Sequence, residues 1–224
     1  MIEIDTFFLT HNYITSLLLL LPVLMYAEIH YKPRFLHSLL YRKQPEIIFD
    51  IPQRIETEEL PIALIIKDSH KFPIQIQTIS IDIFAGQKKL ISNKLQENIA
   101  VSSLFFHKVY PIDVSKYKGQ KLKLECSLEY SINGKSKTIL NNNYPRIKNK
   151  TLKVYIDPDK RPGSQEWKWG DLHCHSHYTE DQVEFGLPLG LIPQISRSMG
   201  LSFVAITDHS YDLDDRFESW TESA

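Results

Sequence analysis

The stretch that decides the expected fold of the C-terminal quarter is DLHCHS, residues 171–176, together with ITDH at residues 206–209. In an extended strand, residues two positions apart project to the same side, so His173 and His175 can direct their imidazole nitrogens toward one ion. Imidazole is a common ligand of zinc and other divalent transition metals. The stretch therefore predicts metal ligands at the end of a strand.

Polar residues continue beyond this strand. His177, Glu180 and Asp181 lie in the expected loop, where an imidazole and carboxylates would complete or bridge a site of two or three ions. Asp171 lies two positions before His173, so both project to the same side of the strand. Its carboxylate is a candidate to accept a hydrogen bond from the ring nitrogen of a histidine ligand that does not bind the metal, and so to orient that ring. The region thus predicts a multinuclear site.

A helix and a second strand are expected between the two motifs. Apolar residues recur at a helical spacing between Pro188 and Gly200, which are well placed at the two ends of a helix. The apolar run 201–207 is typical of a buried strand and ends at Asp208 and His209. A strand-helix-strand crossover makes its two strands parallel, so both motifs are expected at the carboxyl ends of neighbouring strands.

DLHCHS followed by ITDH resembles the first two motifs of the polymerase and histidinol phosphatase (PHP) superfamily, over roughly the last quarter of the chain. The resemblance implies a distorted seven-stranded β/α barrel that holds two or three divalent ions and hydrolyses phosphate esters. The stretch Thr179-Glu180-Asp181 departs from the common pattern and is similar to a carbaryl-hydrolase-like branch, whose members carry an extra N-terminal domain.

The resemblance also implies roles for individual residues. Metal ligands would be His173, His175 and His209, with Glu180 or Asp181 as the acidic ligand. A separate hypothesis gives catalytic roles to His177 and Asp208. His177 would protonate a leaving group or contact the phosphate. The ions, whether zinc, manganese or iron, would lower the pKa of a bound water and so generate hydroxide for hydrolysis.

The longer part of the chain has a different pattern. Residues 121–130 alternate between apolar and polar side chains, and Asn133-Gly134 predicts a hairpin turn into residues 135–140. Further short strand-like runs are expected at 46–51, 60–67, 74–84, 99–109 and 151–156. The predicted fold class is therefore an N-terminal all-β sandwich, similar to immunoglobulin or fibronectin III modules, followed by the first strand-helix-strand part of an incomplete PHP-type β/α barrel.

Four regions are expected along the chain. Residues 1–44 would form an apolar N-terminal helix or membrane anchor, 45–157 the β-sandwich, 158–166 a linker rich in turn residues, and 167–224 the start of the hydrolase domain. Residues 6–27 hold no Asp, Glu, Lys or Arg and are long enough to cross a bilayer. The polar residues within this run count against a membrane span. The alternative interpretation is a buried helix packed on the sandwich.

The distribution of charge and the number of cysteines bear on the ligands and the cellular location of the protein. Residues 1–165 carry a net charge of +7, whereas residues 166–224 carry −8, as expected where carboxylates await cations. Nucleic-acid binding is not predicted, because net charge alone gives only nonspecific attraction. Two cysteines provide no disulfide framework, which favours a cytoplasmic and possibly membrane-associated location.

Two functional hypotheses follow. In the first, the chain is a metal-dependent hydrolase, a phosphoesterase acting on a phosphate ester or related small molecule. Because only two of seven barrel strands are present, its chain is expected to be truncated, and its activity depends on the missing part. In the second, the chain is a noncatalytic β-sandwich protein for binding or membrane tethering, with a vestigial metal half-site. The substrate, the number of ions and the oligomeric state are open.

Overall fold

A computed structural model describes residues 44–144, 151–162, 167–179 and 186–209. These residues belong to one compact unit, which comprises Lys43–Thr179 and Gly186–Ala224. The strands of this unit are β1 (Glu46–Asp50), β2 (Arg54–Ile55), β3 (Glu59–Lys67), β4 (Ile74–Ala85), β5 (Lys88–Val101), β6 (Phe105–Asp113), β7 (Lys121–Ile132), β8 (Lys135–Leu140), β9 (Leu152–Ile156), β10 (Gly170–Cys174) and β11 (Phe203–Ile206). The helices are the 3₁₀-helix η1 (Ser115–Tyr117) and α2 (Ile192–Ser198).

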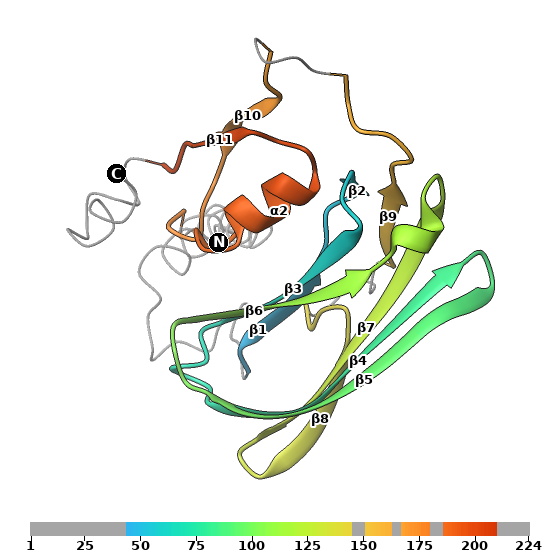
Figure 1. Cartoon of the computed structure of the whole chain (residues 1–224). Helices are drawn as coiled ribbons and strands as arrows, with labels where there is room; N and C mark the ends of the chain where they lie inside the picture. The colour runs from blue at the N-terminus through green and yellow to red at the C-terminus, as the bar shows by residue number, and fades with distance from the viewer. Residues whose placement is uncertain (1–43, 145–150, 163–166, 180–185, 210–224) are drawn as a thin grey trace, which may run out of the picture. The chain divides into compact units, whose positions relative to one another are not determined.

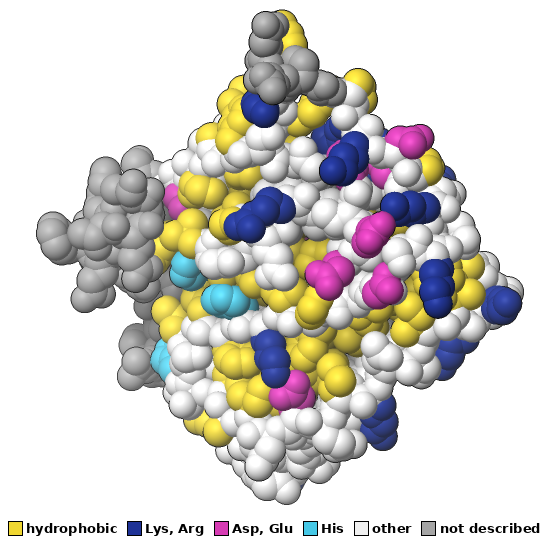
Figure 2. All heavy atoms as spheres, in the orientation of Figure 1, with side chains coloured by type: hydrophobic (Ala, Val, Ile, Leu, Met, Phe, Trp, Pro, Cys, Tyr) yellow, Lys and Arg dark blue, Asp and Glu magenta, His cyan; other side chains and the backbone are white. Residues whose placement is uncertain are grey.

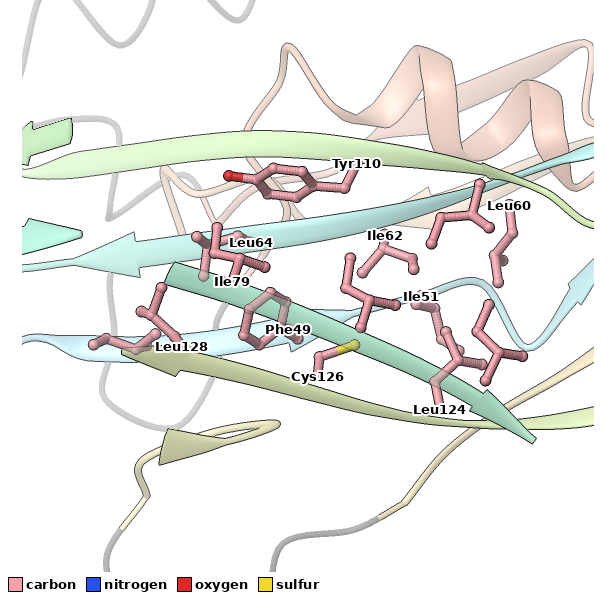
Figure 3. Close-up of a cluster of buried hydrophobic side chains, with 14 of the residues drawn as sticks. Phe49, Ile51, Leu60, Ile62, Leu64, Ile79, Tyr110, Leu124, Cys126 and Leu128 are labelled. Carbon is pink, nitrogen blue, oxygen red and sulfur yellow. The ribbon is translucent and has the colours of Figure 1, made fainter. Parts of the chain in front are cut away.

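Two largely antiparallel sheets enclose the core (Figure 1). The larger sheet has the order β2-β9-β7-β4-β5, with β8 beside β7, and the smaller has the order β1-β3-β6. Figure 3 shows Phe49 and Leu64 of the smaller sheet directed toward Ile79 and Leu128 of the larger one. All four side chains are almost completely buried, so the hydrophobic effect holds the two sheets face to face.

Strand β7 shows why these residues form a sheet. Its apolar members at alternate positions, from Leu122 to Ile132, are buried, while the intervening residues lie toward solvent or are half-buried. The β7–β8 hairpin turns at Asn133 and Gly134, whose φ angles of 50° and 73° match the left-handed positions of a two-residue turn. The strand predicted at 121–130 and the hairpin turn are confirmed.

The strand-helix-strand unit is present as well. Strands β10 and β11 pair in parallel, and α2 lies between them in the sequence. Ile192 and Ile195 are buried on α2, which contacts β3 of the smaller sheet. The apolar face of the helix is therefore covered by the antiparallel sheet.

The predicted fold class is nevertheless wrong. The part of the chain that the structure describes is mostly β-sheet with one short α-helix, and it contains no β/α barrel. The parallel sheet of these residues has only the two strands β10 and β11. A strand-helix-strand pattern is a local signal that occurs in many folds, so it could not establish a barrel.

An ion pair fastens the C-terminal end of α2. The Glu56 carboxylate accepts hydrogen bonds from Arg161 Nε (2.5 Å) and from the Arg161 backbone N–H (3.2 Å). Arg161 Nη2 also donates to the Met199 carbonyl, and the Glu56 N–H donates to the Ser198 carbonyl (2.8 Å). The Arg161 side chain and the Glu56 backbone N–H, from distant parts of the sequence, thereby satisfy carbonyl groups at the end of a helix, which otherwise lack partners.

Several predictions fall outside these residues. Residues 6–27, the proposed anchor, and most of the predicted region 1–44 lie outside the described part of the chain, as do residues 163–166 of the predicted linker. Within the described ranges, no helix is both long and apolar enough to cross a membrane. The domain boundaries at 45, 157 and 167 and the cytoplasmic location stay predictions.

Candidate functional site

Three imidazoles gather where β10 and β11 end. His173 lies in β10, His175 follows that strand, and His209 follows β11. The ring centroids of His173 and His175 are 4.9 Å apart, and those of His175 and His209 are 4.7 Å apart. The parallel pairing explains this approach, because Cys174 is in register with Ile206 and both chains leave the sheet at the same edge. We call these three residues the histidine cluster.

The spacing of the rings permits two physical interpretations. A nitrogen ligand binds zinc at about 2.0–2.1 Å, which places the centroids of two imidazoles on one ion about 5 Å apart. Rings in edge-to-face contact, without an ion, have similar centroid distances. The interplanar angles of 63° and 73° are those of edge-to-face pairs. Among the described residues, no group of three or more His, Cys, Asp or Glu side chains is arranged to hold a metal ion.

Thr207 orients one ring of the cluster. Its hydroxyl oxygen is 3.0 Å from His173 Nδ1 and 3.4 Å from the Cys174 carbonyl oxygen. If the hydroxyl donates to that carbonyl, it accepts from the protonated Nδ1, which leaves the Nε2 lone pair for another partner. The only sequence signal for this role of Thr207 is its place within ITDH. Asp171, the candidate for orienting a ring, accepts from the His173 backbone N–H (3.1 Å).

Asp208 connects the two strand ends. Its carboxylate accepts hydrogen bonds from the Ser176 backbone N–H (2.6 Å), the Ser176 hydroxyl (2.6 Å) and the Thr179 hydroxyl (2.9 Å). Ser176 and Thr179 are both buried. The contacts of Asp208 are those of a positioning residue, which holds the segment after β10 against the end of β11. A catalytic role for Asp208 stays a prediction.

The remaining predicted residues lie in other surroundings. His177 contacts Phe105 of β6 edge to face, at a centroid distance of 4.9 Å, and also packs on Tyr178. Its backbone N–H donates to the Leu187 carbonyl (3.1 Å). The structure therefore places His177 between β10 and the smaller sheet. Glu180 and Asp181, the predicted acidic ligands, lie outside the described residues.

Cys174 lies between His173 and His175 of the cluster and carries a thiol, a second kind of candidate metal ligand. Burial raises the pKa of its thiol, and the negative charges of Asp171 and Asp208 raise it further. In the metal-free chain the thiol is therefore protonated at neutral pH.

Comparisons with known proteins assign no family. No family model matches the chain, and no curated protein matches it. Among solved structures, the chain is similar to the solution structure of a candidate late embryogenesis abundant (LEA) protein, with 14% sequence identity and a TM-score of 0.36. The match covers 60% of this chain and 86% of that one. A likeness this weak supports no conclusion about function.

The predicted membership of the PHP superfamily is contradicted by these findings. No PHP family model matches the chain, and the described residues contain neither a β/α barrel nor a formed metal centre. The identification of the chain as a PHP-superfamily protein is therefore wrong. DLHCHS and ITDH are short, and histidines at the ends of paired parallel strands converge in any fold that contains such a pair.

Proposed function

We propose that the histidine cluster binds a divalent transition-metal ion and that the chain is a metal-dependent hydrolase. The observation that supports this proposal is that three imidazoles gather at the ends of two paired strands, with ring centroids 4.9 and 4.7 Å apart. The described residues are not arranged around an ion as they stand, so the rings would turn their nitrogens toward one ion on binding. The proposal rests on this geometry and on the chemistry of imidazole, and needs no family membership.

Each residue would contribute in a definite way. Nε2 of His173, freed by the contact between Nδ1 and Thr207, would be one donor, and His175 and His209 would supply two more. Asp208 would fix the segment after β10 through Ser176 and so keep the two strand ends together. A bound ion would supply a water of lowered pKa for hydrolysis.

Imidazole ligands do not discriminate sharply among zinc, manganese and iron. The cluster would hold one ion, and the predicted site of two or three ions would require Glu180, Asp181 or another carboxylate to join it. A phosphate ester or related small molecule as substrate stays a prediction, as does a catalytic proton transfer by His177.

The test is a hydrolysis assay on the full chain with three variants. p-Nitrophenyl phosphate and p-nitrophenyl acetate would be offered with zinc, manganese or iron(II), using wild type, His175→Ala, His209→Ala and the control His70→Ala. His70 is exposed and lies before β4, remote in sequence from the cluster. We expect metal-dependent turnover by wild type and His70→Ala and its loss in the two cluster variants. Turnover that survives His175→Ala and His209→Ala would exclude the cluster as its source.

A second function is favoured by one observation. Because the described residues hold no ready-made metal group, the chain also fits a noncatalytic β-sheet binding protein in which the cluster is a vestigial half-site. In that case wild type would hydrolyse neither ester with any of the three metals. Metal binding without turnover would retain the cluster as a site and reject the hydrolase.

A further inference from the structure

Large apolar side chains are exposed beside strand β10. Leu172 on this strand is 74% exposed, and Phe203 at the start of β11 is 48% exposed. The Phe203 ring covers Gly170, because a Cβ atom on that glycine would lie 2.3 Å from the ring. Leu172 is two positions after Gly170, so its side chain lies on the same side of the strand as this ring. We call Leu172 and Phe203 the β10 patch.

The backbone of β10 is open as well. Among the described strands, β10 pairs only with β11, so its second edge can accept another strand. Residues 167–173 are all exposed, and Figure 2 shows hydrophobic side chains at the surface near the top of the view, where Figure 1 places β10. Parallel sheets are normally buried on both faces, and a sheet of two strands is marginally stable. A further strand would therefore stabilise this sheet.

Another edge of the fold is protected by charge, and β10 is not. Strand β5, at the end of the larger sheet, carries the exposed cations Lys88, Lys89 and Lys94. Lysines on an edge strand discourage pairing with another chain, because covering the edge would remove their charges from water. Strand β10 contains no Lys or Arg, and Asp171 is its one acidic residue. Its edge therefore lacks the protection that β5 has.

A second copy of the chain fits this edge. Antiparallel pairing of β10 with itself about a two-fold axis uses the same surface on both copies, as a closed dimer requires. With Leu172 on the axis, the two Leu172 side chains are opposite each other, and each Asp171 is opposite His173 of the other copy. Opposite residues have Cβ atoms about 4.5–5.5 Å apart, so leucine meets leucine and a carboxylate meets an imidazole. No like charges meet in this register.

We infer that β10 pairs antiparallel with β10 of a second copy, which forms a sheet of the order β11-β10-β10-β11. The β10 patch of each copy would be covered in this sheet. Strand β10 has 5 residues, so the contact is small and the dimer should be reversible and depend on concentration. The inference does not rest on the proposed metal site, because the contact is made by backbone groups and by Leu172.

The experiment is sedimentation velocity of the full chain from about 5 to 200 µM, a range suited to a micromolar dimer. EDTA would be present throughout, so that the result does not depend on metal binding by the histidine cluster. The proteins are wild type, Leu172→Glu and the matched control Leu95→Glu, which places the same substitution on the edge strand β5. Both leucines are exposed, so both variants are expected to fold.

We expect wild type and Leu95→Glu to pass from monomer to dimer over this range. The association constant of Leu172→Glu should fall at least about tenfold, because two carboxylates would meet at the axis. A wild type that stays monomeric at every concentration would overturn the inference. Dimerisation of Leu172→Glu as strong as that of wild type would also overturn it.

Hydrogen exchange of wild type gives a second measurement that needs no variant. Amide exchange at residues 170–173 should be slower at the concentration that gives dimer than at the concentration that gives monomer, because the pairing covers these groups. A dimer that leaves their exchange unchanged would use another surface and would overturn the inference. Monomeric wild type that binds phosphatidylcholine vesicles, and loses this binding in Leu172→Glu, would instead assign the β10 patch to a lipid surface.

Discussion

Asp208 is the residue whose contacts are clearest in the candidate site. One carboxylate accepts three hydrogen bonds, two from Ser176 and one from Thr179, and so joins the segment after β10 to the end of β11. The sequence indicated that Asp208 lies at the end of a strand beside His209. It could not indicate these partners, because Ser176 and Thr179 are about thirty positions away and only the fold brings them near.

Replacing Asp208 by alanine should loosen this segment. The Ser176 N–H and hydroxyl and the Thr179 hydroxyl would lose their acceptor, and a buried donor without a partner costs about 1–3 kcal/mol. We expect faster amide hydrogen exchange at Ser176 in Asp208→Ala, measured by NMR. Asp171→Ala is the control, because Asp171 is exposed and accepts one hydrogen bond, from the His173 N–H. Unchanged exchange at Ser176 in Asp208→Ala would contradict the positioning role.

Asp50 makes a prediction about pH. Its folded-state pKa is raised, chiefly by burial, so the folded chain keeps this proton to a higher pH than the unfolded chain does. Between the ordinary carboxyl pKa and the raised one, stability therefore falls as pH rises, and the penalty persists above that window. Asp50→Asn keeps the oxygen that accepts from Ile51 and has no charge to bury. It should be more stable than wild type at pH 7, with a smaller gain at pH 3.

Urea unfolding at the two pH values measures this difference, with Asp113→Asn as the control. Hydrogen bonds with Ser115 lower the pKa of the exposed Asp113 carboxyl, so its stabilising effect is present at pH 7 and lost as pH falls through the lowered pKa. Asp113→Asn should therefore lose stability relative to wild type at pH 7 and less so at pH 3. The same sign for both variants would refute this explanation.

Among the elements, β7 and its hairpin could be predicted from the sequence because their signals are local. Alternation of apolar residues fixes which face is buried, and Asn133-Gly134 suits two consecutive left-handed positions. The parallel pairing of β10 with β11 was likewise predictable from the strand-helix-strand pattern. The bulge in β4 near Thr78 and the pairing of the short β2 with β9 were not, because neither has a distinctive composition.

Gly200 is needed for two reasons, and only one of them could be predicted from the sequence. The sequence suggested a glycine at the end of the helix, and its φ of 75° agrees with a helix-ending residue. The structure adds that a Cβ atom here would lie 2.3 Å from Glu56 Oε2, where the carboxylate receives Arg161. Only the tertiary fold brings Glu56 to this position.

Gly200→Ala should therefore destabilise the chain more than Gly86→Ala. Both glycines have a positive φ, so alanine costs about 1–2 kcal/mol at either position. Gly86 has open space around its missing side chain, whereas Gly200 has the Glu56 carboxylate. Urea unfolding should show a larger loss for Gly200→Ala, and equal losses would show that the carboxylate moves aside without penalty.

On the scale of the whole molecule, the sequence predicted short strands well and their assembly poorly. Strand propensity depends on residues that are neighbours in the sequence. The pairing of β1 with β3 and of β3 with β6 depends on contacts between segments that are distant in the sequence. The β/α barrel was predicted from a family resemblance carried by two short motifs. In the structure, α2 packs on β3, so the apolar face of this helix is buried against an antiparallel sheet.

The core between the two sheets should dominate stability. Leu128→Ala removes a fully buried side chain and should lower the free energy of unfolding by about 2–5 kcal/mol. Leu95→Ala makes the same chemical change at a side chain that is 37% exposed, and should have a much smaller effect. Equilibrium urea denaturation compares the two. Similar losses would mean that Leu128 does not belong to the core that holds the sheets together.

The central claim is that the histidine cluster binds a divalent ion. The most direct measurement is zinc content after equilibrium dialysis of the full chain, determined by elemental mass spectrometry for wild type, His175→Ala and the control His70→Ala. We predict stoichiometric zinc in wild type and in His70→Ala, and its loss in His175→Ala, because the ring of His175 lies next to both other rings of the cluster. Zinc that is absent from wild type, or that His175→Ala retains in full, would contradict the claim.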